Sequence, residues 1–99
     1  MAHFVYKLVP PRPTFAMDMS EVEAKLMGEH AAYWRQMDRG HVIVFGPVMD
    51  PAGVWGLGVL DTVDEDEARS LVLADPVIEA GTCSFELHPI DAVVPADTS

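Results

Sequence analysis

Four histidines are the candidates for proton transfer near neutral pH, because the reference pKa of imidazole is about 6.5. They are His3, His30, His41 and His88. No two of them stand at the spacing of a short metal-binding pair such as H-x-x-H or H-E-x-x-H, so the sequence predicts no metal site. His30 is the strongest candidate, because it lies one helical turn from both Leu26 and Trp34 on an apolar stripe. An imidazole there would exchange protons in a pocket that holds little water. The alternative is a core histidine that is hydrogen-bonded to a backbone carbonyl.

Asp75 is the second candidate for acid–base chemistry. It follows a predicted helix over 62–74, whose negative dipole end disfavours ionisation of a carboxylate. The step Asp75-Pro76 also fits another role, since Asp is a good N-cap and Pro is favoured at the first position of a short turn through 77–79. If Asp75 reached His30, it would fix the tautomer of the imidazole and stabilise the imidazolium. The long separation in the chain leaves that contact open.

The other residues with reactive side chains are weaker candidates. Ser84, Glu86 and His88 share one face of a predicted strand, which is typical of a solvated edge, and Glu86 and His88 are reserve acid–base residues. Cys83 is expected to be an inert buried thiol. The acidic run over 64–67 favours a helix N-terminus stabilised by the dipole over a metal site. No G-x-G-x-x-G, Walker or G-x-S-x-G motif is present.

Proline and glycine divide the chain into the elements that must position these side chains. Strands are predicted over 3–9, 41–48, 54–60 and 82–90, and helices over 20–40 and 62–74, with a connector over 12–19. Ser20 and Glu23 form a capping-box pattern at the start of the first helix, and Gly40 favours its end. The order predicts an α+β, ferredoxin-like βαββαβ fold: a four-stranded antiparallel sheet with two helices on one face.

The first helix has a predicted buried face that includes His30. Its residues recur at helical spacing and are Val22, Leu26, His30, Trp34 and Met37. Gly28 weakens the helix by roughly 1 kcal/mol relative to Ala without breaking it.

The predicted hairpin is apolar on both of its faces. Trp55, Leu57 and Val59 point one way, and in the preceding strand Val42 and Val44 oppose Ile43 and Phe45. Two helices cover only one face of a sheet, so we expect a second copy to cover the other and form an isologous homodimer through sheet faces. A tail and connector folded over that face are the alternative, and a dimer of dimers stays open.

Three glycines, Gly46, Gly56 and Gly58, lie within the predicted hairpin strands. Glycine inside a strand loses side-chain packing and increases the entropy cost of folding. We therefore expect a helix side chain or a small ligand to approach the backbone there.

Composition limits the classes of partner. At 99 residues and 10.8 kDa the chain forms one domain, and 49% hydrophobic residues with a mean hydropathy of +0.16 exclude general disorder. Six basic and sixteen acidic residues give a formal charge of −10, which repels phosphates, so neither nucleic acid nor membrane is an expected partner. With one cysteine and no signal peptide or long apolar run, we expect a cytoplasmic protein.

Taken together, several segments resemble the YCII-related (YciI-like) domain family of the dimeric α+β barrel superfamily. They are Glu29-His-Ala-Ala-Tyr-Trp-Arg35, Gly40 through Phe45-Gly-Pro47, Asp75-Pro-Val-Ile-Glu-Ala-Gly81 and Glu86-Leu-His-Pro89. The resemblance covers nearly the whole chain, so we expect one domain over 1–90 and a polar tail over 91–99. It implies a dimer and a catalytic pair in a pocket near the dimer interface, which maps onto His30 and Asp75. Some members are linked to the catabolism of small aromatic compounds. The longer proline-rich connector over 10–19 departs from the family pattern and would reshape the pocket mouth.

These expectations combine into a cofactor-independent acid–base enzyme of lyase, isomerase or hydrolase type. It would act on a small organic molecule, aromatic ones included, with His30 moving the proton and Asp75 orienting the imidazole. The expected walls of the substrate pocket are Trp34, Phe45, Gly46 and Pro47. A non-catalytic small-molecule-binding or accessory module with the same pocket is the alternative. A third interpretation is an oxygenase-like activity, which a requirement for dioxygen would reveal.

Overall fold

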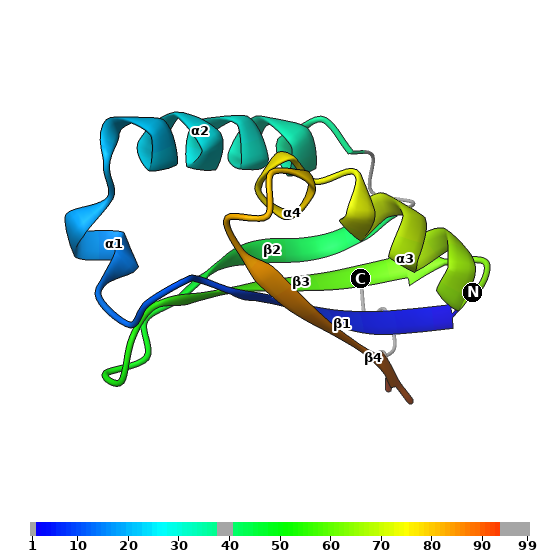
Figure 1. Ribbon diagram of the computed structural model, residues 1–99. Helices are drawn as coiled ribbons and strands as arrows, with labels where there is room; N and C mark the ends of the chain where they lie inside the picture. The colour runs from blue at the N-terminus through cyan, green and yellow to red at the C-terminus, as the bar shows by residue number, and fades with distance from the viewer. Residues whose placement is uncertain (1, 38–40, 94–99) are drawn as a thin grey trace, which may run out of the picture.

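The computed structural model describes residues 2–37 and 41–93 of the chain (Figure 1). Along these residues the elements are β1 (Ala2–Val9), α1 (Phe15–Asp18), α2 (Glu21–Arg35), β2 (Val42–Val48), β3 (Trp55–Thr62), α3 (Glu65–Leu73), α4 (Pro76–Glu79) and β4 (Ser84–Ile90). The predicted order of strands and long helices is confirmed. The one-turn helix α4 forms where Asp75-Pro76 indicates a short turn. Residues 91–93 continue without regular structure, and the rest of the predicted tail lies outside the described residues.

The four strands form one antiparallel sheet in the order β2-β3-β1-β4. Figure 1 shows α2, α3 and α4 on the same side of this sheet, with α1 beyond one end of it. The α+β ferredoxin-like fold predicted from the sequence is therefore confirmed. The arrangement places the C-terminal end of α3 and the start of α4 under α2, where residues distant in the chain meet.

β1 directs alternate side chains toward the helices. Phe4, Tyr6 and Leu8 are buried on that side, whereas Val5 and Lys7 are half-buried on the other. The buried residues that pack with them come from both long helices, α4, β2, β3 and the position just before β4: Trp34, Val42, Leu60, Ala68, Val72, Val77 and Cys83. The core therefore lies between the sheet and the helices.

Two glycines of β3 lie opposite large side chains of β1. A Cβ added at Gly56 would lie 2.9 Å from the Cβ of Leu8, and one at Gly58 would lie 3.3 Å from Cδ2 of Tyr6. A close approach is confirmed at both positions, and side chains of the neighbouring strand make it, whereas the prediction named a helix side chain or a small ligand. At Gly46 no described atom lies within 4 Å of such a Cβ, so no helix side chain approaches there, and the approach of a small ligand stays a prediction.

The alternation predicted for β2 is wrong at its start because of a β-bulge. Val42 pairs with Leu60 and Val44 pairs with Val59, so Ile43 is an extra residue. The extra residue shifts the pleat by one position. Phe45 therefore pairs with Gly58 on the helix side of the sheet and packs against the same core as Val42.

α2 begins with the predicted capping box. Ser20 Oγ accepts a hydrogen bond from the Glu23 amide (3.1 Å), and Glu23 Oε1 accepts one from the Ser20 amide (2.8 Å). The helix continues through Gly28 and ends at Arg35, while the predicted stop at Gly40 lies outside the described residues. Val22 is 70% exposed, so the predicted apolar stripe is wrong in its first turn.

The sheet face turned away from the helices, here called the open face, carries Val5, Val44, Trp55, Leu57 and Val59. Their register places them on one side: Val59 pairs with Val5 and Val44, and Nζ of Lys7 lies 4.8 Å from the centre of the Trp55 ring. Val44 is 54% exposed, and the other four are half-buried. No helix of the described chain covers these side chains (Figure 1).

Candidate active site

His30 and Asp75 meet on the helix side of the sheet. His30 projects from α2, and Asp75 stands at the N-terminus of α4. Nδ1 of His30 lies 2.7 Å from Oδ2 of Asp75, and the two side chains are 14% and 0% exposed. Asp75 also caps α4 by accepting from the Val77 amide (3.1 Å). Both roles that the sequence left open for Asp75 therefore hold at once.

The Asp75 carboxylate accepts hydrogen bonds from four groups. Besides the His30 and Val77 contacts, Oδ2 accepts from Tyr6 Oη (2.9 Å) and Trp34 Nε1 (2.6 Å). Burial by itself raises the pKa of Asp75, but the hydrogen bonds from His30 and Trp34, the charge of the imidazole and the Val77 amide outweigh it. The pKa of Asp75 is thus held below its ordinary value. Asp75 is therefore ionised at neutral pH.

The ionised partner determines the tautomer of His30. A carboxylate only accepts hydrogen bonds, so Nδ1 of His30 must be the donor. In the neutral ring Nε2 is then an acceptor. Nε2 makes no hydrogen bond to any residue within 2–37 and 41–93, and His30 lines a cavity. The arrangement leaves one lone pair available to a ligand.

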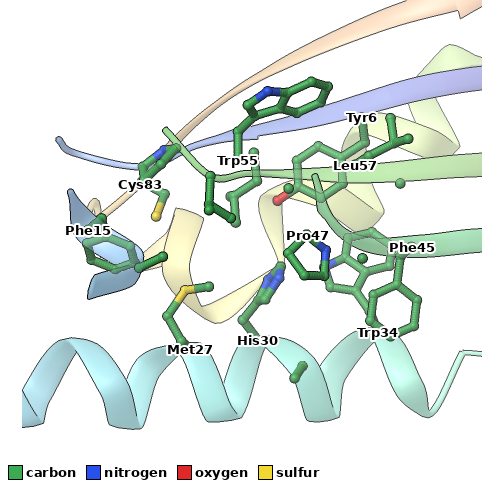
Figure 2. A pocket seen from close by; sticks show the side chains of 18 of the residues that line it. Tyr6, Phe15, Met27, His30, Trp34, Phe45, Pro47, Trp55, Leu57 and Cys83 are labelled. Atoms are coloured by element: carbon green, nitrogen blue, oxygen red, sulfur yellow. The ribbon is translucent and has the colours of Figure 1, made fainter. Parts of the chain in front are cut away.

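A cavity of about 490 Å³ opens beside the His30 ring (Figure 2). Its volume falls within the range of about 300–1,000 Å³ that is typical of small-molecule sites. Apolar side chains make up most of its wall, including Leu8, Phe15 and Met27. The four predicted pocket residues also line it: Trp34, Phe45, Gly46 and Pro47.

Tyr6 and Trp34 present their rings to the cavity rather than their polar atoms. Their hydroxyl and indole N–H groups both donate to Asp75, and the two ring centres lie 5.3 Å apart. Burial and the nearby Asp75 charge raise the pKa of Tyr6 far above its ordinary value, so its hydroxyl keeps its proton. The two rings therefore act as apolar walls.

Cys83 and the reserve pair Glu86 and His88 are not placed to exchange protons with a ligand in the cavity. Cys83 is buried at the cavity wall, and burial together with the Asp75 charge raises the pKa of its thiol to about 11, so it stays protonated at neutral pH. The reserve residues Glu86 and His88 are exposed on β4, where Oε1 of Glu86 lies 3.0 Å from Nε2 of His88. Neither of the reserve residues lines the cavity.

Among the residues that the structure describes, no group of three or more His, Cys, Asp and Glu side chains is arranged to hold a metal ion.

The segment predicted as a plain connector contributes a wall of the cavity. This prediction is wrong for Phe15–Asp18, which form α1. Phe15 is 3% exposed, and it lines the cavity with Ala16 and Met19. On its other side the segment contacts the β2–β3 loop, where a Cβ at Gly53 (φ +142°) would lie 3.0 Å from the Pro13 carbonyl oxygen.

Arg12 fastens α1 to the start of α2. Its guanidinium donates to both carboxylate oxygens of Glu23 (2.8 and 2.9 Å) and to Oδ1 of Asp18 (2.8 Å). The hydrogen bonds from Arg12 to Glu23, together with the backbone hydrogen bond from Ser20, lower the pKa of Glu23 to about 2. The Thr14 hydroxyl donates to Oδ2 of Asp18 (2.7 Å) across α1.

Comparisons with known proteins identify one family model and one solved structure that are similar to this chain. The model of the YCII-related domain matches residues 4–91. A solved structure similar to the chain is that of 5-chloro-2-hydroxyhydroquinone dehydrochlorinase from Burkholderia phenoliruptrix AC1100 in complex with 2,5-dihydroxybenzoquinone. Its TM-score is 0.62 at 19% identity, over 89% of this chain and 91% of that chain. No curated protein matches. Among the described residues no helix is both long and apolar enough to cross a membrane.

Proposed function

This chain belongs to the YCII-related domain family, and we propose that it is an acid–base enzyme in which His30 transfers a proton to or from a small organic molecule. One observation carries the proposal. The buried Asp75 carboxylate holds Nδ1 of His30 at 2.7 Å, while Nε2 stays unbonded among the described residues beside an apolar cavity of about 490 Å³. A positioned base with a fixed tautomer next to a ligand-sized cavity is the arrangement that general acid–base catalysis requires.

In the proposed reaction, Nε2 of neutral His30 accepts a proton from an acidic C–H or O–H group of the substrate. Asp75 stabilises the imidazolium that forms, because it is ionised and bonded to the opposite ring nitrogen. The imidazolium then returns the proton to the product or to a leaving group. A positioned general base raises the rate by roughly 10²–10⁴-fold. These steps use side chains of the chain itself, so we propose a reaction that is independent of a cofactor.

The cavity favours a small flat substrate. The rings of Tyr6, Trp34 and Phe45 offer apolar surface around His30. The dehydrochlorinase of similar fold has a chlorinated hydroxyhydroquinone in its name and a dihydroxybenzoquinone in its structure. We therefore propose an aromatic or quinonoid substrate, and a lyase reaction before an isomerase or hydrolase one.

The test compares two histidine variants on a named compound. Chloride release from 5-chloro-2-hydroxyhydroquinone is measured first, followed by the conversion of related hydroxylated rings. We expect His30→Asn to lower kcat/KM by about 10²–10⁴-fold for any compound that the chain converts. His88→Asn is the matched control, because it removes an exposed imidazole outside the cavity. It should leave kcat/KM unchanged.

Two outcomes would argue against the enzyme. Equal turnover by His30→Asn and the unmodified chain would refute the role of His30. A compound that binds in the cavity and is recovered unchanged, with the same affinity in His30→Asn, would instead favour the non-catalytic binding module.

We also propose that the chain forms a homodimer through the open face. Its side chains Trp55, Leu57 and Val59 are apolar, and no described helix covers them. A second copy related by a two-fold axis would bury the same residues on both sheets. A cytoplasmic location stays a prediction from the composition.

A further inference from the structure

The polar groups of the cavity wall reduce to two side chains. Tyr6 and Trp34 use their only side-chain donors on Asp75, Trp55 uses its indole N–H on Asp50, and the Cys83 thiol stays protonated. The remaining polar side chains that line the cavity are His30, through Nε2, and Arg35. Arg35 has no role in the proton transfer proposed above.

Arg35 is a cation without a partner in the described part of the chain. It is exposed at the end of α2, and its guanidinium makes no hydrogen bond or ion pair with residues 2–37 or 41–93. The other described arginines are paired, Arg12 with Glu23 and Asp18, and Arg69 with Glu65. Arg35 is among the residues that line the cavity.

Arg35 and His30 are spaced along one helix at a distance that suits a single small ligand. Five residues of α-helix correspond to about 7.5 Å along its axis and a rotation of roughly 140° around it. His30 and Arg35 therefore lie at the two edges of the part of α2 that lines the cavity, with Ala31 and Trp34 between them. The apolar wall between them, formed by Trp34 and Ala31 on the same helix, offers no other charge.

We propose that Arg35 binds an oxyanion of the ligand, a carboxylate or a phenolate, while the ring of that ligand occupies the apolar cavity beside His30. The planar guanidinium donates two parallel hydrogen bonds to such a group. A chain with a formal charge of −10 repels anions at long range, so an anionic ligand needs a local cation at the cavity. The inference rests on the proposed function for the position of the ligand, and it specifies the substrate class as a small aromatic acid or phenol in its ionised form.

The test uses two probes of similar shape and different charge, benzoate and benzamide. Their dissociation constants are measured by isothermal titration calorimetry. We expect the unmodified chain to prefer benzoate, and Arg35→Gln to weaken benzoate binding roughly tenfold with little effect on benzamide. Lys25→Gln is the matched control: it removes one positive charge from the same helix, at an exposed residue that does not line the cavity. It should leave both constants unchanged.

A third variant, His30→Asn, tests whether Arg35 or a protonated His30 causes the preference for benzoate over benzamide. In His30→Asn the preference for benzoate should persist, and its loss there would overturn the proposal. Undetectable or equal binding of the two probes by the unmodified chain, or an equal loss in Arg35→Gln and Lys25→Gln, would also overturn it. Because neither probe undergoes a reaction, failure here is distinguishable from failure of the catalytic proposal, which turnover in His30→Asn decides. Circular dichroism establishes that each variant is folded.

Discussion

At the scale of single residues, Asp75 is both a core group and a site group. One of its oxygens accepts from Tyr6, His30 and Trp34, and the other accepts from the Val77 amide. Burying a carboxylate is costly unless hydrogen bonds compensate it. Here four donors from β1, α2 and α4 compensate it, so the same contacts that position the imidazole also join these elements.

Replacing this carboxylate should therefore affect stability in a pH-dependent manner. Asp75→Asn should lower the free energy of unfolding at pH 7 by roughly 1–3 kcal/mol, because an amide cannot accept all of these hydrogen bonds and leaves buried donors without a partner. The folded-state pKa of Asp75 lies below its unfolded value of about 3.9. The carboxylate thus stabilises the fold above that pH, and the contribution is lost as the pH falls through the folded pKa. Urea unfolding at pH 7 and pH 3 measures the difference.

The control for this prediction is Asp91→Asn, which changes an exposed carboxylate just after β4. It should have little effect at either pH. A difference between the unmodified chain and Asp75→Asn that stays constant from pH 7 to pH 3 would contradict the assignment.

The residue scale also shows what the sequence could predict. The capping box at Ser20 and the cap at Asp75 depend on neighbours within three positions, so both can be predicted from the local sequence. The contact between His30 and Asp75 spans 45 positions. No local pattern encodes a contact of that length, so the residues themselves left it open. The resemblance to a known family mapped a catalytic pair onto these two positions, and that catalytic role stays a prediction.

At the scale of elements, α1 is the main feature that the sequence did not predict. Its four residues would not form a stable isolated helix, since a single turn cannot offset the cost of nucleation. Tertiary contacts hold it: Phe15 is buried at the cavity, and Arg12 connects Asp18 to Glu23. The bulge at Ile43 was missed for a similar reason, because register is a property of two strands and not of one.

Removing the hydrogen bonds that Arg12 makes to Asp18 and Glu23, here called the Arg12 clamp, should increase local opening of α1 and of no other element. In Arg12→Gln the hydrogen bonds to Asp18 and Glu23 are lost or weakened, so the amides of α1 should exchange with solvent faster than in the unmodified chain. Hydrogen exchange followed by mass spectrometry measures this over residues 14–19. Arg69→Gln, which breaks an exposed pair on α3, should leave those amides unaffected. Unchanged exchange in Arg12→Gln would show that the clamp does not hold α1.

At the scale of the whole molecule, the two faces of the sheet differ in how they are covered. The helix side is buried within one chain, while the open face leaves apolar residues such as Val44 and Trp55 accessible. Monomeric proteins rarely leave a large contiguous apolar patch in water. The sequence predicted apolar strands on both faces, and a sheet with helices on one side cannot bury both by itself.

The dimer can be tested by adding one charge to this face. Val59→Glu should convert a dimer of twice 10.8 kDa into a monomer, since it would bury a carboxylate at the interface without a partner. Light scattering coupled to size-exclusion chromatography measures the mass. Leu73→Glu is the control, because Leu73 is an exposed apolar residue on α3 on the opposite side of the sheet. A monomeric unmodified chain, or a dimeric Val59→Glu, would refute the interface.

The contacts of α1 have an implication for engineering. Phe15, Ala16 and Met19 line the cavity but contribute nothing to the hydrogen bonds around Asp75. Mutant libraries that vary these three positions can change the shape offered to a ligand while the acid–base pair keeps its geometry. The fold thus separates the contact between His30 and Asp75 from the part of the cavity wall that substitutions can reshape, and changes in ligand preference are best sought in that wall.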